Sequence, residues 1–412
     1  MKKILLLFAI AVAALASCTK KNEMKQGPWL GVIQFNPQDR SMDLPFNMNY
    51  SVNEAGEMQL ALTNADEKII ISEIAKNGDT LIIKPPVFTS VIVAVLRNDS
   101  LVGKYYPKGI EVGTFYKFYA VYGITDRFPW YTEKASYDIS GRWRVIENPG
   151  TKDSTVMVGE FKQIGDRVLG TFLNTTGDYR FLEGKVSGNK FFFSKVDGAQ
   201  TFIFTADLKD QNTMENGRFM ANPKYSSTWK ANRDDKIELP AGDQIVHLKK
   251  GVSTFDFAGL DMNGQKVTSK DPRFEGKVLA VLAGGSWCPN CLDEARLFGD
   301  LYKKYKDKGF EVVALNFEDK TFEPSRKKMQ RFIDQTGATY TFLYVSPRGG
   351  AKRDSVLYPI EGQMAFPTGM FIDRLGHIRK VETGFSGPGT GEHYTKFVDE
   401  TTKLIELLLS EK

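Results

Sequence analysis

The sequence predicts two fold classes in one chain of 412 residues, an all-β N-terminal region followed by an α/β domain. Residues 27–240 consist of short β-branched and aromatic runs separated by Gly, Asn and Asp, which is typical of antiparallel strands and tight hairpins. From residue 250 onward, apolar runs alternate with segments of helical periodicity, which indicates a sheet covered by helices. A chain of this length can hold two or three domains, each with its own core.

The composition is that of an ordinary globular protein. Apolar side chains make up 42% and charged side chains 25% of the residues, which excludes disordered and collagen-like chains. The formal net charge is +5, and no basic stripe with interleaved aromatic residues stands out, so we expect no nucleic-acid partner. Three cysteines and three histidines are too few for a disulfide framework or a Cys/His zinc cage, and we therefore expect no metal and no cofactor.

Residues 1–17 have the pattern of a bacterial export signal. Lys2 and Lys3 precede an apolar run over 4–15, which is too short to span a bilayer as a helix. The run ends in Leu-Ala-Ser directly before Cys18, and this arrangement resembles the lipobox of bacterial lipoproteins. The resemblance implies that residues 1–17 are removed, that Cys18 carries lipid and that residues 18–26 form a polar tether. The protein would then be anchored to a bilayer in the cell envelope and face the periplasm. The alternative is a plain secretory signal with an incidental cysteine.

Residues 27–240 are expected to close into an antiparallel barrel or to pack as a sandwich, because either arrangement removes exposed strand edges. Gly-Pro-Trp at 27–29 recurs as Gly-Arg-Trp at 141–143, and Gly-Lys-Tyr at 103–105 recurs as Gly-Arg-Phe at 217–219. Both pairs are separated by 114 positions, which predicts a duplicated unit over 27–138 and 139–240. Coincidence in a chain rich in Gly and aromatic residues is the alternative. No acid pair, His cluster or phosphate loop at a persuasive spacing is found in this region.

Residues 250–412 are expected to form a central sheet covered on both faces. The continuous apolar run over 277–283 predicts a strand buried on both sides. The elements expected after it are a helix over 292–308, a strand over 310–316, a helix over 327–335, a strand over 339–345, a hairpin that turns at 374–377 and a closing helix over 396–409.

The motif that carries chemistry is Trp287-Cys288-Pro289-Asn290-Cys291, at the junction between the buried strand and the next helix. A second motif, Phe366-Pro367-Thr368, precedes a later strand. Together they resemble the thioredoxin superfamily, and within it the membrane-tethered TlpA/ResA-like thiol-disulfide oxidoreductases. The resemblance covers about residues 250–410 and includes an added hairpin at 255–267 and an inserted helix and strand at 327–345. The family often has an aromatic and a small residue where this chain has Gly284 and Gly285.

The position of each cysteine predicts its role. Cys288 lies just before a helix N-terminus, where the free N–H groups stabilise a thiolate, so it is the expected nucleophile. Cys291, one turn into the helix, is within bonding reach and is expected to resolve the mixed disulfide by forming a redox disulfide with Cys288. Both remaining thiols lie in this domain, so we expect all redox chemistry within residues 250–412.

The resemblance implies roles for five further residues. Pro367 is expected to be cis, with its loop facing the cysteine pair and the backbone of Phe366 pairing with a substrate chain. Trp287 and Thr368 would complete the substrate-binding surface. Glu294 matches an active-site acid of the family and would shuttle the proton of Cys291 or raise the thiol pKa values. The alternative for Glu294 is a solvated helix residue.

These residues predict an exported, lipid-anchored thiol-disulfide oxidoreductase. Its partners would be disulfide-bearing exported proteins and a membrane electron donor, and the reductive direction is implied by the resemblance alone. One alternative is a peroxide reductase of the same superfamily, although the Pro-x-x-x-Thr-x-x-Cys loop typical of that class does not precede Cys288. Another is a ligand- or partner-binding lipoprotein with an accessory redox domain, which a large apolar cavity in 27–240 would favour.

Overall fold

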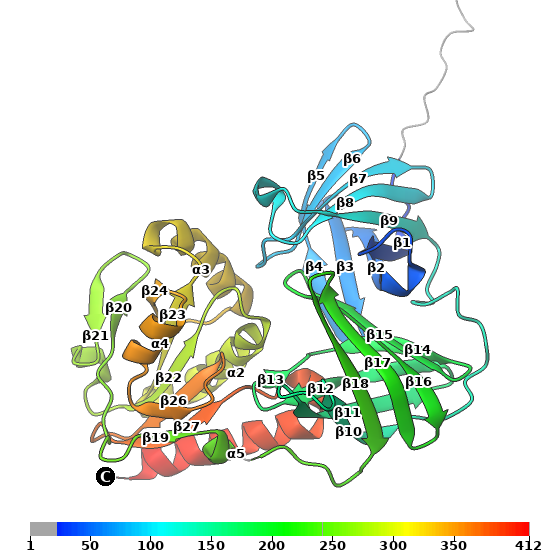
Figure 1. Ribbon diagram of the computed structural model, residues 1–412. Coiled ribbons are helices and arrows are strands. Elements are labelled where there is room, and N and C mark those ends of the chain that lie inside the picture. Colours follow the sequence, from blue (N-terminus) through cyan, green and yellow to red (C-terminus); the bar gives the residue numbers. More distant parts are fainter. Residues whose placement is uncertain (1–22, 241, 412) are drawn as a thin grey trace, which may run out of the picture.

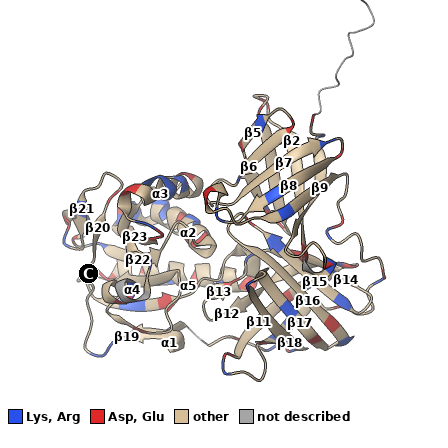
Figure 2. Cartoon of the chain, turned by 45° about the horizontal axis from the view of Figure 1, so that its top comes forward, with Lys and Arg blue, Asp and Glu red and all other residues tan. Residues whose placement is uncertain are grey.

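The computed structural model describes residues 23–240 and 242–411, and it consists of two β-sheet units followed by an α/β domain (Figure 1). Cys18 and the predicted export signal lie outside the described residues. Among the described helices, none is both long and apolar enough to cross a membrane. Acidic and basic side chains are distributed over all three parts of the molecule (Figure 2).

The first unit is a nine-stranded antiparallel sheet in the order β4-β3-β2-β1-β9-β8-β7-β6-β5. Its first strand, β1, pairs with both β2 and β9, so the two ends of the unit meet in the middle of the sheet. The interior is filled by large side chains such as Trp29, Phe46 and Phe118, all essentially buried. The elements are β1 (Gly27–Gln34), η1 (Arg40–Met42), β2 (Asp43–Val52), β3 (Met58–Asn64), β4 (Glu67–Ile71), β5 (Glu73–Asn77), β6 (Thr80–Lys84), β7 (Val91–Arg97), β8 (Ser100–Tyr106), η2 (Ile110–Val112) and β9 (Tyr116–Tyr122).

The second unit is a closed antiparallel barrel. Strand β11 pairs with both β10 and β12, which joins the two ends of the sheet. Its core is a stack of aromatic rings, in which Phe204 lies 4.4 Å from both Phe172 and Phe219 between ring centroids. The all-β prediction for this half of the chain is therefore confirmed. The strands are β10 (Gly141–Glu147), β11 (Thr155–Ile164), β12 (Arg167–Asn174), β13 (Gly177–Asp178), β14 (Leu182–Ser187), β15 (Lys190–Val196), β16 (Thr201–Asp210), β17 (Thr213–Asn222) and β18 (Tyr225–Arg233).

The repeated sequence motifs occupy equivalent places in the two units. Trp29 and Trp143 lie in the first strand of each unit, and each indole Nε1 donates to the backbone oxygen four residues earlier at 2.9 Å. Gly103 and Gly217 lie in the next-to-last strands, β8 and β17. A Cβ at Gly103 would lie 2.0 Å from a backbone oxygen of β7, and one at Gly217 would lie 2.3 Å from the Trp229 ring. Both glycines thus permit a close approach of neighbouring strands, which supports the proposed duplication.

The C-terminal domain has a seven-stranded mixed sheet in the order β21-β20-β24-β23-β22-β26-β27. Strands β22, β23 and β24 are parallel to one another, and β26 runs antiparallel to β22. The fully buried β22 sends alternate side chains into two apolar clusters, one under α2, α3 and α5 and one under α4 and the 246–274 segment. The described elements are α1 (Gly242–Ile245), β19 (Val246–Leu248), β20 (Ala258–Leu260), β21 (Lys266–Thr268), η3 (Pro272–Phe274), β22 (Val278–Gly284), α2 (Pro289–Tyr305), η4 (Lys306–Lys308), β23 (Phe310–Glu318), α3 (Phe322–Thr336), β24 (Thr341–Pro347), α4 (Gly350–Val356), β25 (Ile360–Gly362), β26 (Thr368–Ile372), β27 (Ile378–Thr383), η5 (Pro388–Thr390) and α5 (Glu392–Ser410).

Candidate active site

The two cysteines lie at the N-terminus of α2, directly beyond the carboxyl end of β22. Cys288 is the N-cap residue of α2, and its sulfur accepts a hydrogen bond from the Cys291 backbone N–H at 3.2 Å. The two residues are joined by a disulfide, with Cα atoms 5.2 Å apart. Gly284 permits this packing, because a Cβ there would lie 2.9 Å from the Cys291 sulfur. The first turn of α2 therefore directs a backbone N–H donor at the Cys288 sulfur.

The loop before β26 faces the cysteine pair. The Phe366–Pro367 peptide bond is cis, as the sequence predicts, and the Phe366 carbonyl oxygen lies 3.7 Å from the Cys288 sulfur. Thr368 is buried, and its hydroxyl donates to the Ala365 carbonyl oxygen at 2.6 Å. The Thr368 side chain thus fixes the loop from within, while Phe366 is half-buried at its surface.

Trp287 is half-buried beside this loop. Its indole Nε1 donates to the Phe317 carbonyl oxygen at 2.7 Å, and its ring meets the Phe366 ring edge-on with centroids 5.7 Å apart. The Arg348 guanidinium lies 4.3 Å from the Trp287 ring centroid, in a cation–π contact. Arg348 lies beyond β24 and was not among the predicted site residues.

Glu294 points into the protein rather than into solvent. The residue is 6% exposed, which contradicts its reading as a solvated helix residue. Glu294 and Cys291 line a cavity of about 20 Å³, together with Asn316 and Tyr340. Burial, together with the charge of Glu382, raises the pKa of Glu294 well above its usual range. A buried acid that holds its proton to higher pH is suited to general acid–base work on a neighbouring thiol.

A second buried acid, Glu318 at the end of β23, forms hydrogen bonds with Ser286, which directly precedes the motif. It accepts hydrogen bonds from the Ser286 backbone N–H at 2.8 Å and from the Ser286 hydroxyl at 2.7 Å. Burial raises the pKa of Glu318. The sequence signal for this role is an acid at the carboxyl end of a buried strand.

The β-rich region also reaches the motif. The Asn290 side-chain amide donates to the Asp178 carbonyl oxygen at 3.1 Å, and Asp293 forms an ion pair with Arg180. The sequence predicts all redox chemistry within residues 250–412 and gives no indication of these contacts from the β-rich region.

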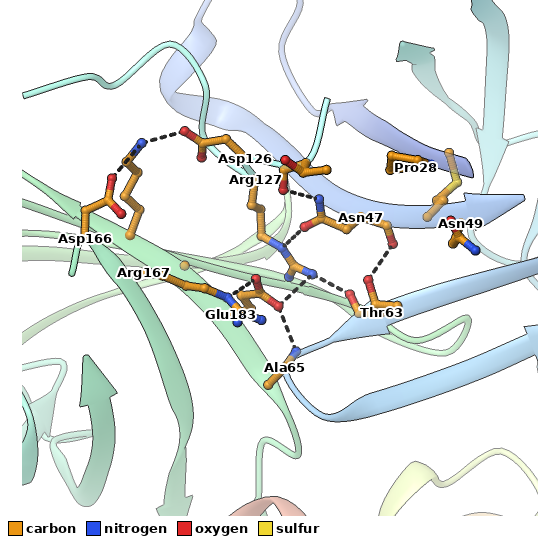
Figure 3. A pocket seen from close by; sticks show the side chains of 14 residues that line it. Pro28, Asn47, Asn49, Thr63, Ala65, Asp126, Arg127, Asp166, Arg167 and Glu183 are labelled. Carbon is orange, nitrogen blue, oxygen red and sulfur yellow. Dashed lines mark hydrogen bonds and ion pairs between the residues drawn. The ribbon is translucent and has the colours of Figure 1, made fainter. Parts of the chain in front are cut away.

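A cavity of about 530 Å³ lies between the two β-sheet units (Figure 3). Its charged side chains are paired with one another: the Arg127 guanidinium lies 3.7 Å from Glu183, and the Lys185 ammonium lies 2.6 Å from Asp126. Arg127 also donates from Nε to the Asn47 side-chain oxygen at 2.9 Å. Paired charged side chains thus form much of the lining of this cavity, whereas the alternative of a ligand-binding lipoprotein predicts a large apolar cavity.

A cysteine pair at a helix N-terminus, beside a cis-proline loop and on a sheet of this topology, defines a thioredoxin-fold thiol-disulfide oxidoreductase. A family model described as Redoxin matches residues 241–396. The thiol-disulfide oxidoreductase ResA of Bacillus thuringiensis subsp. konkukian is 28% identical over 155 residues, which cover 38% of this chain and 80% of that protein. The thioredoxin-like protein YneN of Bacillus subtilis is 29% identical over 139 residues, which cover 34% of this chain and 74% of that protein.

Among solved structures, the thioredoxin domain of a Bacteroides vulgatus thiol-disulfide oxidoreductase is 24% identical, with a TM-score of 0.27. The match covers 37% of this chain and 99% of the Bacteroides vulgatus chain. Over its C-terminal domain, the chain is similar to the ResA/TlpA-like thiol-disulfide oxidoreductases of the thioredoxin superfamily, and it is a protein-disulfide oxidoreductase.

Proposed function

We propose that the protein is an exported, lipid-anchored reductase of protein disulfides that works through Cys288 and Cys291. The observation that carries the proposal is the placement of the Cys288 sulfur. It lies at the N-cap of α2, accepts the Cys291 N–H, and is 3.7 Å from the carbonyl oxygen that precedes the cis-proline. A sulfur in this place can be stabilised as a thiolate and can meet an extended substrate backbone at the same time.

The reaction consists of two exchanges. In the reduced protein, the Cys288 thiolate attacks one sulfur of the partner disulfide, a Cys288–partner bond forms, and the other partner sulfur leaves as a thiolate and takes up a proton. The Cys291 thiolate then attacks the Cys288 sulfur. The Cys288–Cys291 disulfide forms, and the partner leaves as a dithiol that has gained two electrons. A dithiol donor at the membrane returns two electrons to the protein and restores its thiols.

The helix N-terminus makes Cys288 the better nucleophile. Thiols at such positions reach pKa values of roughly 3.5–7.5, against about 8.5 for a free cysteine. Cys291 lies within the first turn of α2, where its sulfur faces Glu294 and the small cavity. That cavity has room for about one water molecule, which is enough to relay a proton between the Cys291 sulfur and the Glu294 carboxylate.

The cis-proline loop is the proposed substrate-binding edge. The Phe366 backbone would pair in the manner of a strand with an extended partner segment, and the half-buried rings of Trp287 and Phe366 lie beside it. Thr368 holds this loop in place through its hydrogen bond to Ala365.

The proposed location follows from the N-terminal sequence. The basic and apolar segment before Cys18 favours export, and lipid on Cys18 would hold the redox domain beside a bilayer, where a membrane donor can reduce it. Disulfide-bearing substrates belong to the same oxidising side of the membrane.

Trapping of the mixed disulfide tests the proposal. With Cys291→Ser, the first exchange proceeds and the second does not, so exported proteins should accumulate in reductant-sensitive complexes with Cys288. Cys288→Ser is the matched control and should trap none. Complexes that form with Cys288→Ser but not with Cys291→Ser would contradict the assigned roles.

A further inference from the structure

Three loops of the β-rich region lie against the redox motif, and we refer to residues 85–90, 177–180 and 197–200 as the cap. Val87 and Phe88, in the loop between β6 and β7, are 2% and 8% exposed. Both belong to the same buried apolar cluster as Cys288 and Cys291, and Ala199 packs against that cluster. The first unit and the barrel therefore both contribute side chains to the apolar cluster that contains the two cysteines.

The cap loops are fastened to one another. The Ser90 hydroxyl donates to the Gly198 carbonyl oxygen at 2.6 Å, which joins the first unit to the barrel. Gly198 has a φ of +90°, and a Cβ there would lie 2.7 Å from Pro85, so the loops meet at a point that favours glycine. The Asp197 side chain closes its own turn by accepting the Gln200 N–H at 2.7 Å.

The third part of the cap, residues 177–180, contacts Asn290, one of the two residues between the cysteines. The Asn290 amide donates to the Asp178 carbonyl oxygen at 3.1 Å, and a Cβ at Gly177 would lie 2.7 Å from the same amide nitrogen. The Asp178 carboxylate accepts the backbone N–H of Gly387, in the segment that leads to α5. Asp178 thus joins this part of the cap to the redox domain at two places, the motif itself and the segment before α5.

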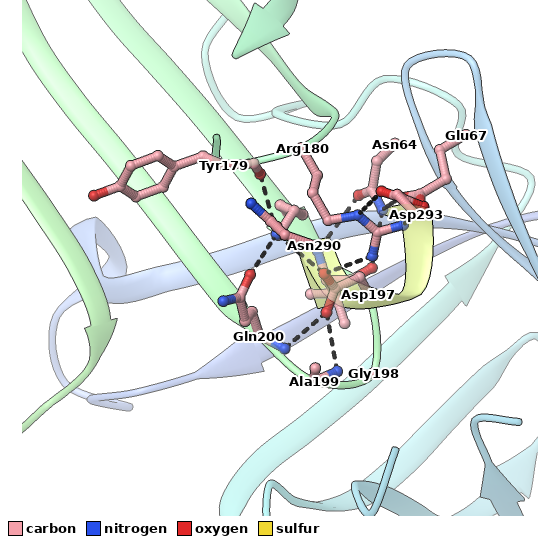
Figure 4. A network of polar contacts seen from close by, with 12 residues as sticks. Asn64, Glu67, Tyr179, Arg180, Asp197, Gly198, Ala199, Gln200, Asn290 and Asp293 are labelled. Carbon is pink, nitrogen blue, oxygen red and sulfur yellow. Dashed lines mark hydrogen bonds and ion pairs between the residues drawn. The ribbon is translucent and has the colours of Figure 1, made fainter. Parts of the chain in front are cut away.

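One guanidinium links all three parts of the molecule (Figure 4). Arg180 of the barrel binds Asp293 of α2 in a two-bond contact of 2.8 and 3.1 Å. It also binds Glu67 of the first unit at 2.6 Å and Asp197 at 3.4 Å. Lys195 adds a second cation, 3.0 Å from Asp197. These side chains are nearly or fully buried, so the Arg180–Asp293 contact is a desolvated ion pair between the cap and the redox helix.

The consequence is that the disulfide is covered. Cys288 and Cys291 are each 5% exposed, whereas exchange requires the attacking sulfur to approach the attacked sulfur in line. A small dithiol needs room beside one sulfur only, whereas a folded partner also needs room for the surface around its own sulfur.

We propose that the cap determines which molecules exchange with the Cys288–Cys291 disulfide: closed, it excludes folded proteins, and opening of the Arg180–Asp293 contact admits them. This inference rests on the proposed function, in which proteins are the partners. The Arg180–Asp293 ion pair is suited to opening, because the cost of desolvating its two charges offsets much of their attraction. Both ions regain water when they separate.

The test compares two reductants on the oxidised full-length protein. The rates of reduction of the Cys288–Cys291 disulfide by dithiothreitol and by a reduced thioredoxin are measured for wild type, Asp293→Asn and Asp234→Asn. In wild type, two cations of this cluster, Arg180 and Lys195, face three carboxylates. Asp293→Asn leaves the two cations facing Glu67 and Asp197, so the variant does not strand an excess buried cation. Asp234→Asn is the matched control, because it removes a part-exposed ion pair with Arg144 in the barrel.

Asp293→Asn should raise the thioredoxin rate relative to the dithiothreitol rate about tenfold, a factor that corresponds to about 1.4 kcal/mol in the closed-to-open equilibrium. Asp234→Asn should leave the ratio at the wild-type value. Phe88→Ser, which alters the apolar side of the cap without touching its charges, should raise the ratio in the same direction. The inference is overturned when neither Asp293→Asn nor Phe88→Ser changes the ratio, or when Asp234→Asn changes it equally. The ratio is measured on the disulfide itself, so a failure to trap partners with Cys291→Ser would defeat the proposed function without altering this result.

Discussion

Glu294→Gln should slow the second exchange while leaving the first nearly intact. The substitution keeps the size of the side chain and removes its titratable proton. Glu294 is buried beside Cys291 across a cavity of about 20 Å³, and burial, together with Glu382, raises its pKa well above the usual range. Loss of a positioned acid–base group typically costs about 10²-fold or more in rate, and a hundredfold loss corresponds to about 2.7 kcal/mol of activation free energy.

A chromogenic disulfide such as Ellman's reagent separates the two exchanges. The reduced protein should release one equivalent of coloured thiolate when Cys288 attacks, and a second equivalent when Cys291 resolves the mixed disulfide. In wild type, the rate of the second phase should rise as pH passes through the raised pKa of Glu294, because the ionised acid accepts the Cys291 proton. In Glu294→Gln, the pH at which the rate of the second phase rises should move toward the pKa of a free thiol, about 8.5.

Glu382→Gln is the control for this assignment. The charge of Glu382 contributes to the raised pKa of Glu294, so its removal should lower that pKa and move the rise of the second phase to lower pH without abolishing it. A second phase with the same rate and the same pH dependence in Glu294→Gln as in wild type would refute the proton relay.

Three further predictions concern stability and location. Burial raises the pKa of Asp178 from 3.8 to about 6, so the stability that its protonated form contributes is complete below the unfolded pKa and is lost as pH rises through the folded pKa. Between pH 5 and pH 7, the free energy of unfolding of Asp178→Asn, measured in urea, should therefore rise by about 1.4 kcal/mol relative to that of wild type. A difference between the two proteins that does not depend on pH would contradict this. Gly217→Ala should destabilise the chain by roughly 1–3 kcal/mol in the same assay, because its Cβ would collide with the Trp229 ring, and unchanged stability would show that the strands adjust. Cys18→Ser should move the protein from the membrane to the soluble periplasmic fraction, and unchanged membrane retention would be incompatible with a lipid anchor.

The order of elements in the C-terminal domain was predictable because its strands are continuous apolar runs. The predicted helix boundaries were less accurate, because the first turns of two helices lack the apolar stripe that marks the rest of each helix. The helix expected over 292–308 begins at Pro289, because its first turn is built by the motif rather than by an apolar stripe. The helix expected over 396–409 begins at Glu392, where polar residues form the first turn. The seven-residue α4 is too short to display a period and was not predicted.

The chemical centre of the site was predictable because its parts are local motifs. Cys288, Cys291 and Phe366–Pro367 lie in two short motifs, the resemblance of these motifs to the thioredoxin superfamily implies the cis bond, and the structure brings them together. Their catalytic and substrate-binding roles stay predictions.

The cap was not predictable from spacing, because its contacts join residues far apart in the chain. Arg180 and Asp293 are separated by 113 positions, and neither carries a motif. Val87 and Phe88 have the composition of ordinary core residues, and the sequence alone does not show which core they enter. Asp293 lies next to the predicted Glu294, yet the two side chains serve different neighbours.

Alkylation of the two thiols tests most directly the claim that Cys288 is the nucleophile. The single variants Cys291→Ser and Cys288→Ser, in the full-length chain, are treated with iodoacetamide over a range of pH. Cys288, at the N-cap of α2, should react faster near neutral pH, with an apparent pKa in the upper part of the range of roughly 3.5–7.5. Faster alkylation of Cys291 than of Cys288 near neutral pH would contradict the assignment of Cys288 as the nucleophile.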